Sequence, residues 1–115
     1  MSIESRKRGL FSLSTDTTPS WSFLTNHAQV LLCIAHDPGV RLREIGDAVG
    51  ITERAAHRIV GELDAAGYIL RTRNGRRNHY TIRSHLPLPD PLAGEQKIGD
   101  LLAILTGQPL PETNG

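Results

Sequence analysis

The sequence predicts a mainly α-helical domain with one small β-hairpin, followed by a C-terminal dimerisation helix. Apolar residues recur at helical spacing through residues 25–36, 42–66 and 95–106. Two runs rich in β-favouring residues, 68–73 and 78–82, flank an Asn-Gly pair, which is the strongest short signal for a hairpin. The chain has 115 residues, of which 38% are apolar and 4% aromatic, so it can form one domain with a small aliphatic core.

The first predicted helix covers residues 25–36. Thr25 or Asn26 can cap its N-terminus, and the Asp-Pro-Gly of residues 37–39 ends it. Its inward stripe is aliphatic and consists of Ala28, Leu31, Ile34 and Ala35, widened by Val30 and Cys33. Because the Cys33 thiol lies inside this apolar run, we interpret it as core filling rather than as a redox sensor.

Residues 42–50 predict a short helix that ends in a tight turn. Ile45 and Val49 are four residues apart, so they lie on one face of this helix. Gly46 is small enough to let a second helix approach closely. Gly50 stands where a left-handed glycine commonly ends a helix.

A second helix is predicted to follow the turn and to end at Gly67. Ile51 can fill the gap between the two helices, and Ala56, Ile59 and Leu63 form the inward stripe. The outward side chains near its start are polar and are our candidate DNA-binding residues of this helix: Thr52, Glu53, Arg54, His57 and Arg58. An exposed helix N-terminus with such side chains is typical of a recognition helix that enters the major groove.

The predicted hairpin carries further candidate DNA-binding residues at its tip, which are Arg73, Arg76, Arg77 and Asn78. We expect Asn74-Gly75 to form the turn and Leu70, Tyr80 and Ile82 to face the core. The short piece 40–42 before the helix pair is expected to be extended. Arginines at a hairpin tip are suited to a minor groove or to phosphates.

Positive charge is concentrated in one part of the chain. The net charge of the whole sequence is only +1, but residues 41–83 hold nine arginines against five carboxylates. Guanidinium groups make bidentate contacts with phosphates and with guanine. This distribution therefore favours a nucleic-acid partner.

A helix, a short strand, a helix-turn-helix and a basic hairpin, in that order, make a winged helix-turn-helix. Residues 24–82 resemble the DNA-binding domain of MarR-type transcriptional regulators, and the sequence suggests a small member of this family. The segments that carry the resemblance are Arg-Leu-Arg-Glu-Ile-Gly-Asp-Ala-Val-Gly-Ile-Thr at 41–52, Glu-Leu-Asp-Ala-Ala-Gly-Tyr-Ile at 62–69 and Gly-Arg-Arg at 75–77. The resemblance implies a homodimer on a pseudo-palindromic operator, with the recognition helix in the major groove and the wing in the minor groove.

The C-terminal helix, predicted over residues 95–106, has one apolar stripe. Its members are Ile98, Leu101, Leu102 and Leu105. An isolated helix of about a dozen residues is marginal in water, so the stripe needs a packing partner. It can fold back on the first helix of its own chain or pack between two subunits. We favour the dimer, because symmetric dimers are the commonest soluble assembly.

The predicted organisation has five parts. Residues 1–20 form a disordered basic and Ser/Thr-rich arm, and residues 21–83 form the winged helix-turn-helix. Residues 84–94 contain three prolines and are expected to be a stiff extended linker. The helix of residues 95–106 and a tail of residues 107–115 complete the chain.

Several function classes lack support in the sequence. We find no catalytic grouping of carboxylates or of Ser, His and Asp, no phosphate loop and no metal-ligand spacing, so we expect a protein that is not an enzyme and has no cofactor. No apolar stretch approaches the roughly 20 residues of a membrane helix. We therefore expect a cytoplasmic protein without membrane contact.

Two functions remain open. The first is a sequence-specific double-stranded DNA-binding regulator. The alternative is a winged-helix protein-interaction module without sequence-specific DNA binding. A module of that kind is expected to present an apolar or acidic outer face, whereas Arg54, His57 and Arg58 are basic or polar. The charges favour the regulator, and the sequence does not identify a small-molecule effector.

Overall fold

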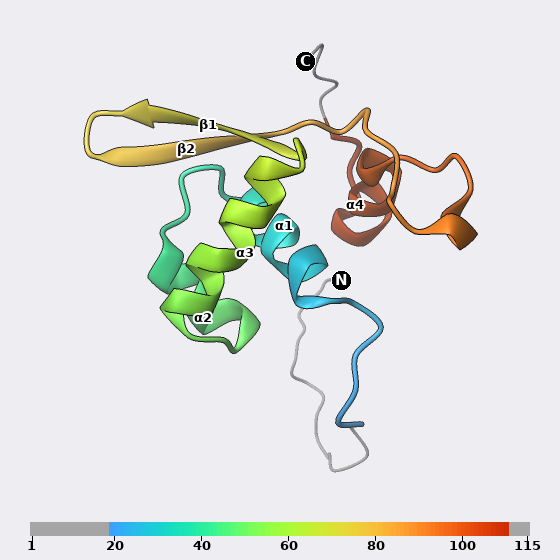
Figure 1. The fold of residues 1–115 in the computed structure, drawn as a ribbon, viewed down its shortest axis with the longest axis horizontal. Helices are drawn as coiled ribbons and strands as arrows, with labels where there is room; N and C mark the ends of the chain where they lie inside the picture. Colours follow the sequence, from blue (N-terminus) through green and yellow to red (C-terminus); the bar gives the residue numbers. More distant parts are fainter. Residues whose placement is uncertain (1–18, 111–115) are drawn as a thin grey trace.

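A computed structural model describes residues 19–110, which fold into a winged helix followed by a returning C-terminal segment (Figure 1). In chain order the elements are α1 (Asn26–His36), α2 (Leu42–Val49), α3 (Glu53–Ala65), β1 (Ile69–Asn74), β2 (Arg77–Ile82), the 3-10 helix η1 (Pro91–Ala93) and α4 (Ile98–Thr106). The predicted winged helix-turn-helix is confirmed, and a C-terminal helix follows it. Residues 1–18 of the expected arm and 111–115 of the expected tail lie outside the described residues.

The core is aliphatic and is built around α1. This helix packs against α2, α3, β2 and α4, so it contacts nearly every other element. The buried core residues are Val30, Leu31, Ile34, Ile45, Ala56, Ile59, Val60, Leu63, Ile69, Tyr80, Ile98 and Leu102. Tyr80 is the one aromatic side chain among them, as expected from the low aromatic content.

Threonine side chains begin two of the helices. The Thr25 hydroxyl accepts a hydrogen bond from the Ala28 N–H at 3.1 Å, and the Thr52 hydroxyl accepts one from the Ala55 N–H at 3.0 Å. Each bond satisfies a backbone donor that has no partner within the helix. Both predicted caps are therefore confirmed.

The segment before α2 is shorter than predicted. Leu42 already belongs to α2, and the extended conformation ends at Arg41. Arg41 starts the helix through its backbone, since its N–H donates to the Glu44 carboxylate at 2.9 Å. Just upstream, the Pro38 carbonyl accepts a hydrogen bond from the Tyr80 N–H at 2.9 Å, which ties the α1–α2 loop to β2.

The turn between α2 and α3 brings the two helices into close contact. A Cβ atom on Gly46 would lie 2.7 Å from the Ile51 carbonyl oxygen, which is closer than a side chain allows. Gly50 ends α2 in the left-handed conformation, with φ of 85°. Both glycines occupy the places that the sequence assigned to them.

The hairpin differs from the prediction in which residue of its first strand is buried. Ile69 pairs with Ile82 and is 1% exposed, whereas Leu70 pairs with Thr81 and is 44% exposed. The expectation that Leu70 faces the core was therefore wrong. Successive side chains of a strand point to opposite faces, and it is Ile69, not Leu70, that shares a face with Tyr80 and Ile82. The turn is also displaced by one residue. Gly75 and Arg76 form it, with φ of 69° at Gly75.

The proline-containing segment folds back instead of extending. The Leu88 N–H donates to the Gln96 carbonyl at 3.0 Å, and the Ile98 N–H donates to the Leu86 carbonyl at 2.8 Å. Leu86 and Leu88 form these hydrogen bonds, whereas Pro87 and Pro89 are the residues that follow each of them. Because no bond of this pairing needs an N–H at residues 87 or 89, proline is tolerated there. The expected stiff extended linker is thus a narrow hairpin-like turn that contains η1.

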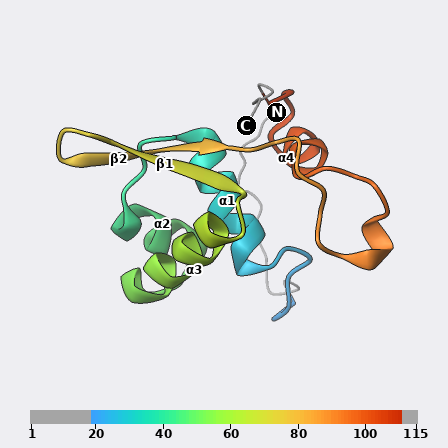
Figure 2. The ribbon, with the colours of Figure 1, turned by 45° about the horizontal axis from the view of Figure 1, so that its top comes forward.

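This turn places α4 on α1 of the same chain, away from the tip of the wing (Figure 2). Ile98 is 4% exposed and Leu102 is fully buried, so both belong to the core of their own chain. The four residues of the C-terminal stripe therefore do not form one exposed face. Two of them pack inside their own chain, whereas we favoured a stripe that packs between two subunits. Leu101 is half-buried and Leu105 is exposed.

We predict that Gly46→Ala lowers the free energy of unfolding by about 1–3 kcal/mol, because the added methyl group forces α2 away from the Ile51 carbonyl. The matched control is Gly61→Ala in α3, where a Cβ atom meets nothing within 4 Å. That change should raise stability by about 0.5–1 kcal/mol, as expected for glycine replaced in a helix. Urea unfolding followed by circular dichroism measures both. Equal effects of the two substitutions would contradict the close approach.

Candidate nucleic-acid interface

The outer face of α3 carries the polar side chains that the sequence singled out. Glu53, Arg54, His57 and Arg58 are all exposed, while Ala56 and Ile59 on the opposite face are buried. Thr52 is exposed too, but its hydroxyl is occupied by the helix cap. The first turns of α3 therefore present a basic and polar surface with a satisfied N-terminus.

Arg58 is held within the chain by a small charged network. The Glu62 carboxylate accepts hydrogen bonds from His27 Nε2 of α1 at 2.7 Å and from Arg58 at 3.2 Å. The hydrogen bond from His27, more than that from Arg58, lowers the pKa of the Glu62 carboxyl from its ordinary value. The Arg58 side chain therefore lies along α3 toward Glu62, one turn later, whereas Arg54 forms no ion pair within residues 19–110.

The tip of the hairpin lies at the same end of the molecule as α2 (Figure 1). Arg76 stands in the turn, and Arg77 is the first residue of β2. Asn78 is half-buried and pairs with Arg73, whose Nε donates to the Gly75 carbonyl at 3.3 Å. The predicted wing residues therefore gather at one tip, separate from the outer face of α3.

A cleft of about 460 Å³ separates the wing from the helix-turn-helix. Its walls come from the start of α2, the start of α3 and the first half of β2, and they consist of Val40, Arg41, Leu42, Arg43, Glu53, Arg76, Arg77, Asn78 and Tyr80. Arg41 and Arg43 are two of the nine arginines of residues 41–83, and their positions in the sequence do not assign them to a site. Only the contact between the α1–α2 loop and β2 brings them to the wing.

Comparison with known proteins agrees with this architecture. A model of the MarR family matches residues 21–77, which include α1, the helix-turn-helix and the hairpin as far as its turn.

This segment of the chain belongs to the MarR family.

The chain is also similar to a solved structure, a MarR family protein of Mycobacterium tuberculosis in complex with salicylic acid. The two are 25% identical over 51% of this chain and 47% of the other, with a TM-score of 0.44. The similarity thus spans about half of that protein. No curated protein matches the chain.

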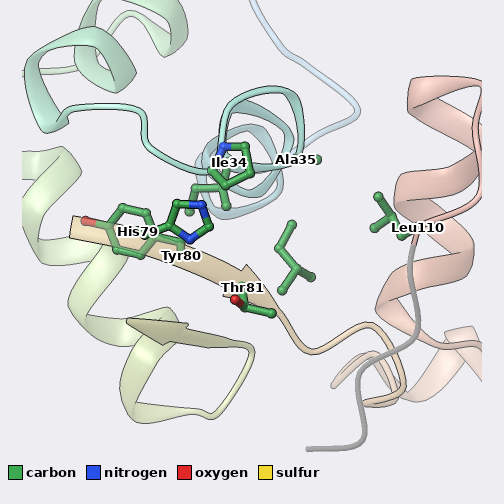
Figure 3. Close-up of a pocket in the computed structure, with 8 residues that line it drawn as sticks. Ile34, Ala35, His79, Tyr80, Thr81 and Leu110 are labelled. Carbon is green, nitrogen blue, oxygen red and sulfur yellow. The ribbon is translucent and has the colours of Figure 1, made fainter. Parts of the chain in front are cut away.

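Besides the cleft beside the wing, this MarR-type protein has another cavity, which lies among mostly apolar residues. Figure 3 shows this cavity of about 230 Å³ between the end of α1 and β2, bordered by Leu110. Burial raises the pKa of the Cys33 thiol in α1, which disfavours the reactive thiolate. In residues 19–110, no group of three His, Cys, Asp or Glu side chains converges to hold a metal ion.

The helices of the described chain are short. Among residues 19–110, no helix combines the length and the apolar character needed to cross a membrane.

We predict that His27→Ala raises the pKa of the Glu62 carboxyl toward its ordinary value, and that Arg58→Ala raises it less. Because the folded-state pKa is lowered, the stabilisation from this network is present above the pKa of the unfolded carboxyl. It is lost as the pH falls through the folded-state pKa. Carbon-13 NMR titration of the side-chain carboxyl measures the pKa. A Glu62 titration that is the same in wild type and His27→Ala would show that the network does not persist in solution.

Proposed function

We propose that this MarR-type protein is a sequence-specific double-stranded DNA-binding transcriptional regulator. It binds a pseudo-palindromic operator as a homodimer, with α3 in the major groove and the wing in the minor groove. The observation that carries the proposal is the outer face of α3. Arg54 and His57 are exposed there beside a capped helix N-terminus, at the end of the molecule where the basic wing also lies.

The chemistry of this face suits base edges. Arginine can donate two hydrogen bonds to guanine, and the Glu53 carboxylate can accept from the amino group of cytosine. Ala56, Ile59 and Val60 on the inner face anchor α3 in the core, so the reading side chains extend from a rigid element. The protein-interaction module is the weaker alternative, since α3 presents no exposed large apolar side chain.

The dimer is supported by the remaining surface of α4. With Ile98 and Leu102 used inside the chain, the outward apolar residues of this helix are Leu101, Leu105 and Ile104, and Ile104 is 78% exposed. Two copies of this face can pack against each other around a two-fold axis. A single winged helix contacts only a few base pairs, so a second copy would supply the other half-site.

Selection of bound sequences from random duplexes tests the proposal directly. A regulator of this kind should enrich a motif with two inverted half-sites, separated by about one turn of DNA. Enrichment of one half-site alone would support DNA reading without the dimer. Failure to enrich any motif would favour the protein-interaction module.

We predict that Arg58→Ala weakens binding to the selected duplex by about 1–3 kcal/mol and changes binding to random duplexes less. The matched variant is Glu62→Gln, which removes the carboxylate that holds Arg58 but keeps the guanidinium. It should bind the selected duplex at least as well as wild type. Fluorescence anisotropy at fixed salt measures all three proteins. An equal loss by Arg58→Ala on both duplexes would reduce its role to a phosphate contact.

We predict that the wild-type protein is a dimer at tens of micromolar and that Leu101→Asp/Leu105→Asp converts it to a monomer. Charges on the outer face of α4 must be desolvated in the dimer, whereas they remain hydrated in the monomer. The control is Leu92→Asp in η1, which changes a fully exposed leucine outside this face. Light scattering gives the mass in solution. A wild type that stays monomeric would remove the dimer from the proposal.

A further inference from the structure

We propose that the cleft between the wing and α2 binds the sugar–phosphate backbone of one DNA strand, and that Arg41 and Arg43 are phosphate-binding residues. This inference rests on the proposed function and adds a contact surface to it. The cleft residues Arg41, Arg43, Arg76 and Arg77 come from two segments that are more than thirty positions apart in the sequence. They line the same cleft because the fold brings the start of α2 next to the tip of the hairpin.

The two walls of the cleft are held in place by the backbone. The hydrogen bond from the Tyr80 N–H to the Pro38 carbonyl joins β2 to the loop that leads into α2. Arg77 follows this loop, since its Nε lies 3.8 Å from the position that a Cβ atom of Gly39 would occupy. The Arg77 side chain is therefore directed toward the α1–α2 loop rather than off the tip of the hairpin.

The charges of the cleft are unbalanced. Four arginines are among the residues that line it, and Glu53 is the one acidic residue among them. Two other arginines of the domain are paired, Arg58 with Glu62 and Arg71 with Asp64. Within residues 19–110, by contrast, none of the four cleft arginines forms an ion pair. Like charges that converge without partners attract an anion.

The shape and position of the cleft point to a phosphodiester backbone. A volume of about 460 Å³ is large for a single phosphate and accommodates a short run of backbone. Val40, Leu42 and Tyr80 supply apolar surface for sugars, and guanidinium groups bind phosphate oxygens in a bidentate manner. The cleft also lies between α3 and the wing. A protein that places these two elements in adjacent grooves must straddle the strand that separates the grooves.

Under this proposal, the two arginines at the tip of the wing contact different parts of the DNA. Arg77 binds the backbone together with Arg41 and Arg43, while Arg76, in the turn itself, is left to reach the minor groove. Glu53 stands at the border of the cleft, where phosphates give way to base edges in the major groove. Phosphate contacts fix the register of a protein on DNA without reading its sequence.

The test is the salt dependence of DNA binding by Arg41→Ala/Arg43→Ala. We expect affinity for selected and random duplexes to fall by the same factor, roughly tenfold or more at about 0.15 M salt. The slope of log K against log salt should become less steep by about two units for each bound protomer, and so by about four units for the proposed homodimer, because each lost phosphate contact removes about 0.9. Both substitutions should leave the fold intact, since α2 starts through the Arg41 backbone and both side chains are exposed.

Two further variants make the result specific to the cleft. Arg41→Lys/Arg43→Lys keeps the charges and should retain most of the salt slope. Arg71→Ala/Lys97→Ala removes two positive charges outside the cleft and should leave affinity and slope close to those of wild type. An equal loss in this control would overturn the inference, because net charge alone would then explain the effect.

The outcomes separate this inference from the function on which it rests. A wild type that binds DNA with a slope unchanged in Arg41→Ala/Arg43→Ala overturns the cleft and leaves the regulator intact. A wild type that binds no duplex, selected or random, overturns the regulator itself. Circular dichroism melting of each variant checks that the fold is unchanged.

Discussion

The structure depends on the close approach of α2 and α3 at Gly46. A Cβ atom at this position would lie 2.7 Å from the Ile51 carbonyl oxygen, so a larger residue would push the two helices apart. At this distance Ile45 of α2 and Ile59 of α3 are both buried in one core. The same approach orients α3, so that its buried stripe faces α1 and its arginines face outward. The orientation of the candidate DNA-reading surface therefore depends on a glycine at position 46.

The small core explains why the C-terminal segment returns. With an aromatic content of 4%, the three helices and the hairpin have few large side chains with which to cover α1. The turn around η1 brings Ile98 and Leu102 onto α1, where both are buried. Tyr68 supports this turn, because its hydroxyl donates to the Pro87 carbonyl at 2.7 Å. The segment thus completes the domain, while Ile104 and Leu105 of α4 stay exposed.

The charge at each part of the surface depends on whether an arginine lies next to a carboxylate, and not on the overall composition. Arg58 and Arg71 are neutralised by carboxylates of α3, whereas the arginines at the start of α2 and at the start of β2 share a cleft with one carboxylate. A protein with a net charge of +1 therefore gathers four arginines around one cleft. That cleft, rather than the net charge, is what a phosphate backbone would encounter.

Local patterns in the sequence determined the helices, their caps and the hairpin. Thr25, Thr52 and Gly50 act through hydrogen bonds or dihedral angles within a few residues, so their roles can be predicted from short segments. The tertiary structure decided what depends on distant partners. Leu70 and Ile69 both fit a strand, and only packing on the helices buries Ile69. The division of the α4 stripe required the fold of the proline segment, and the grouping of Arg41 with Arg77 required the bond between Pro38 and Tyr80. Spacing along a chain specifies one face of one element, whereas the contact between two elements depends on which surfaces can be buried together.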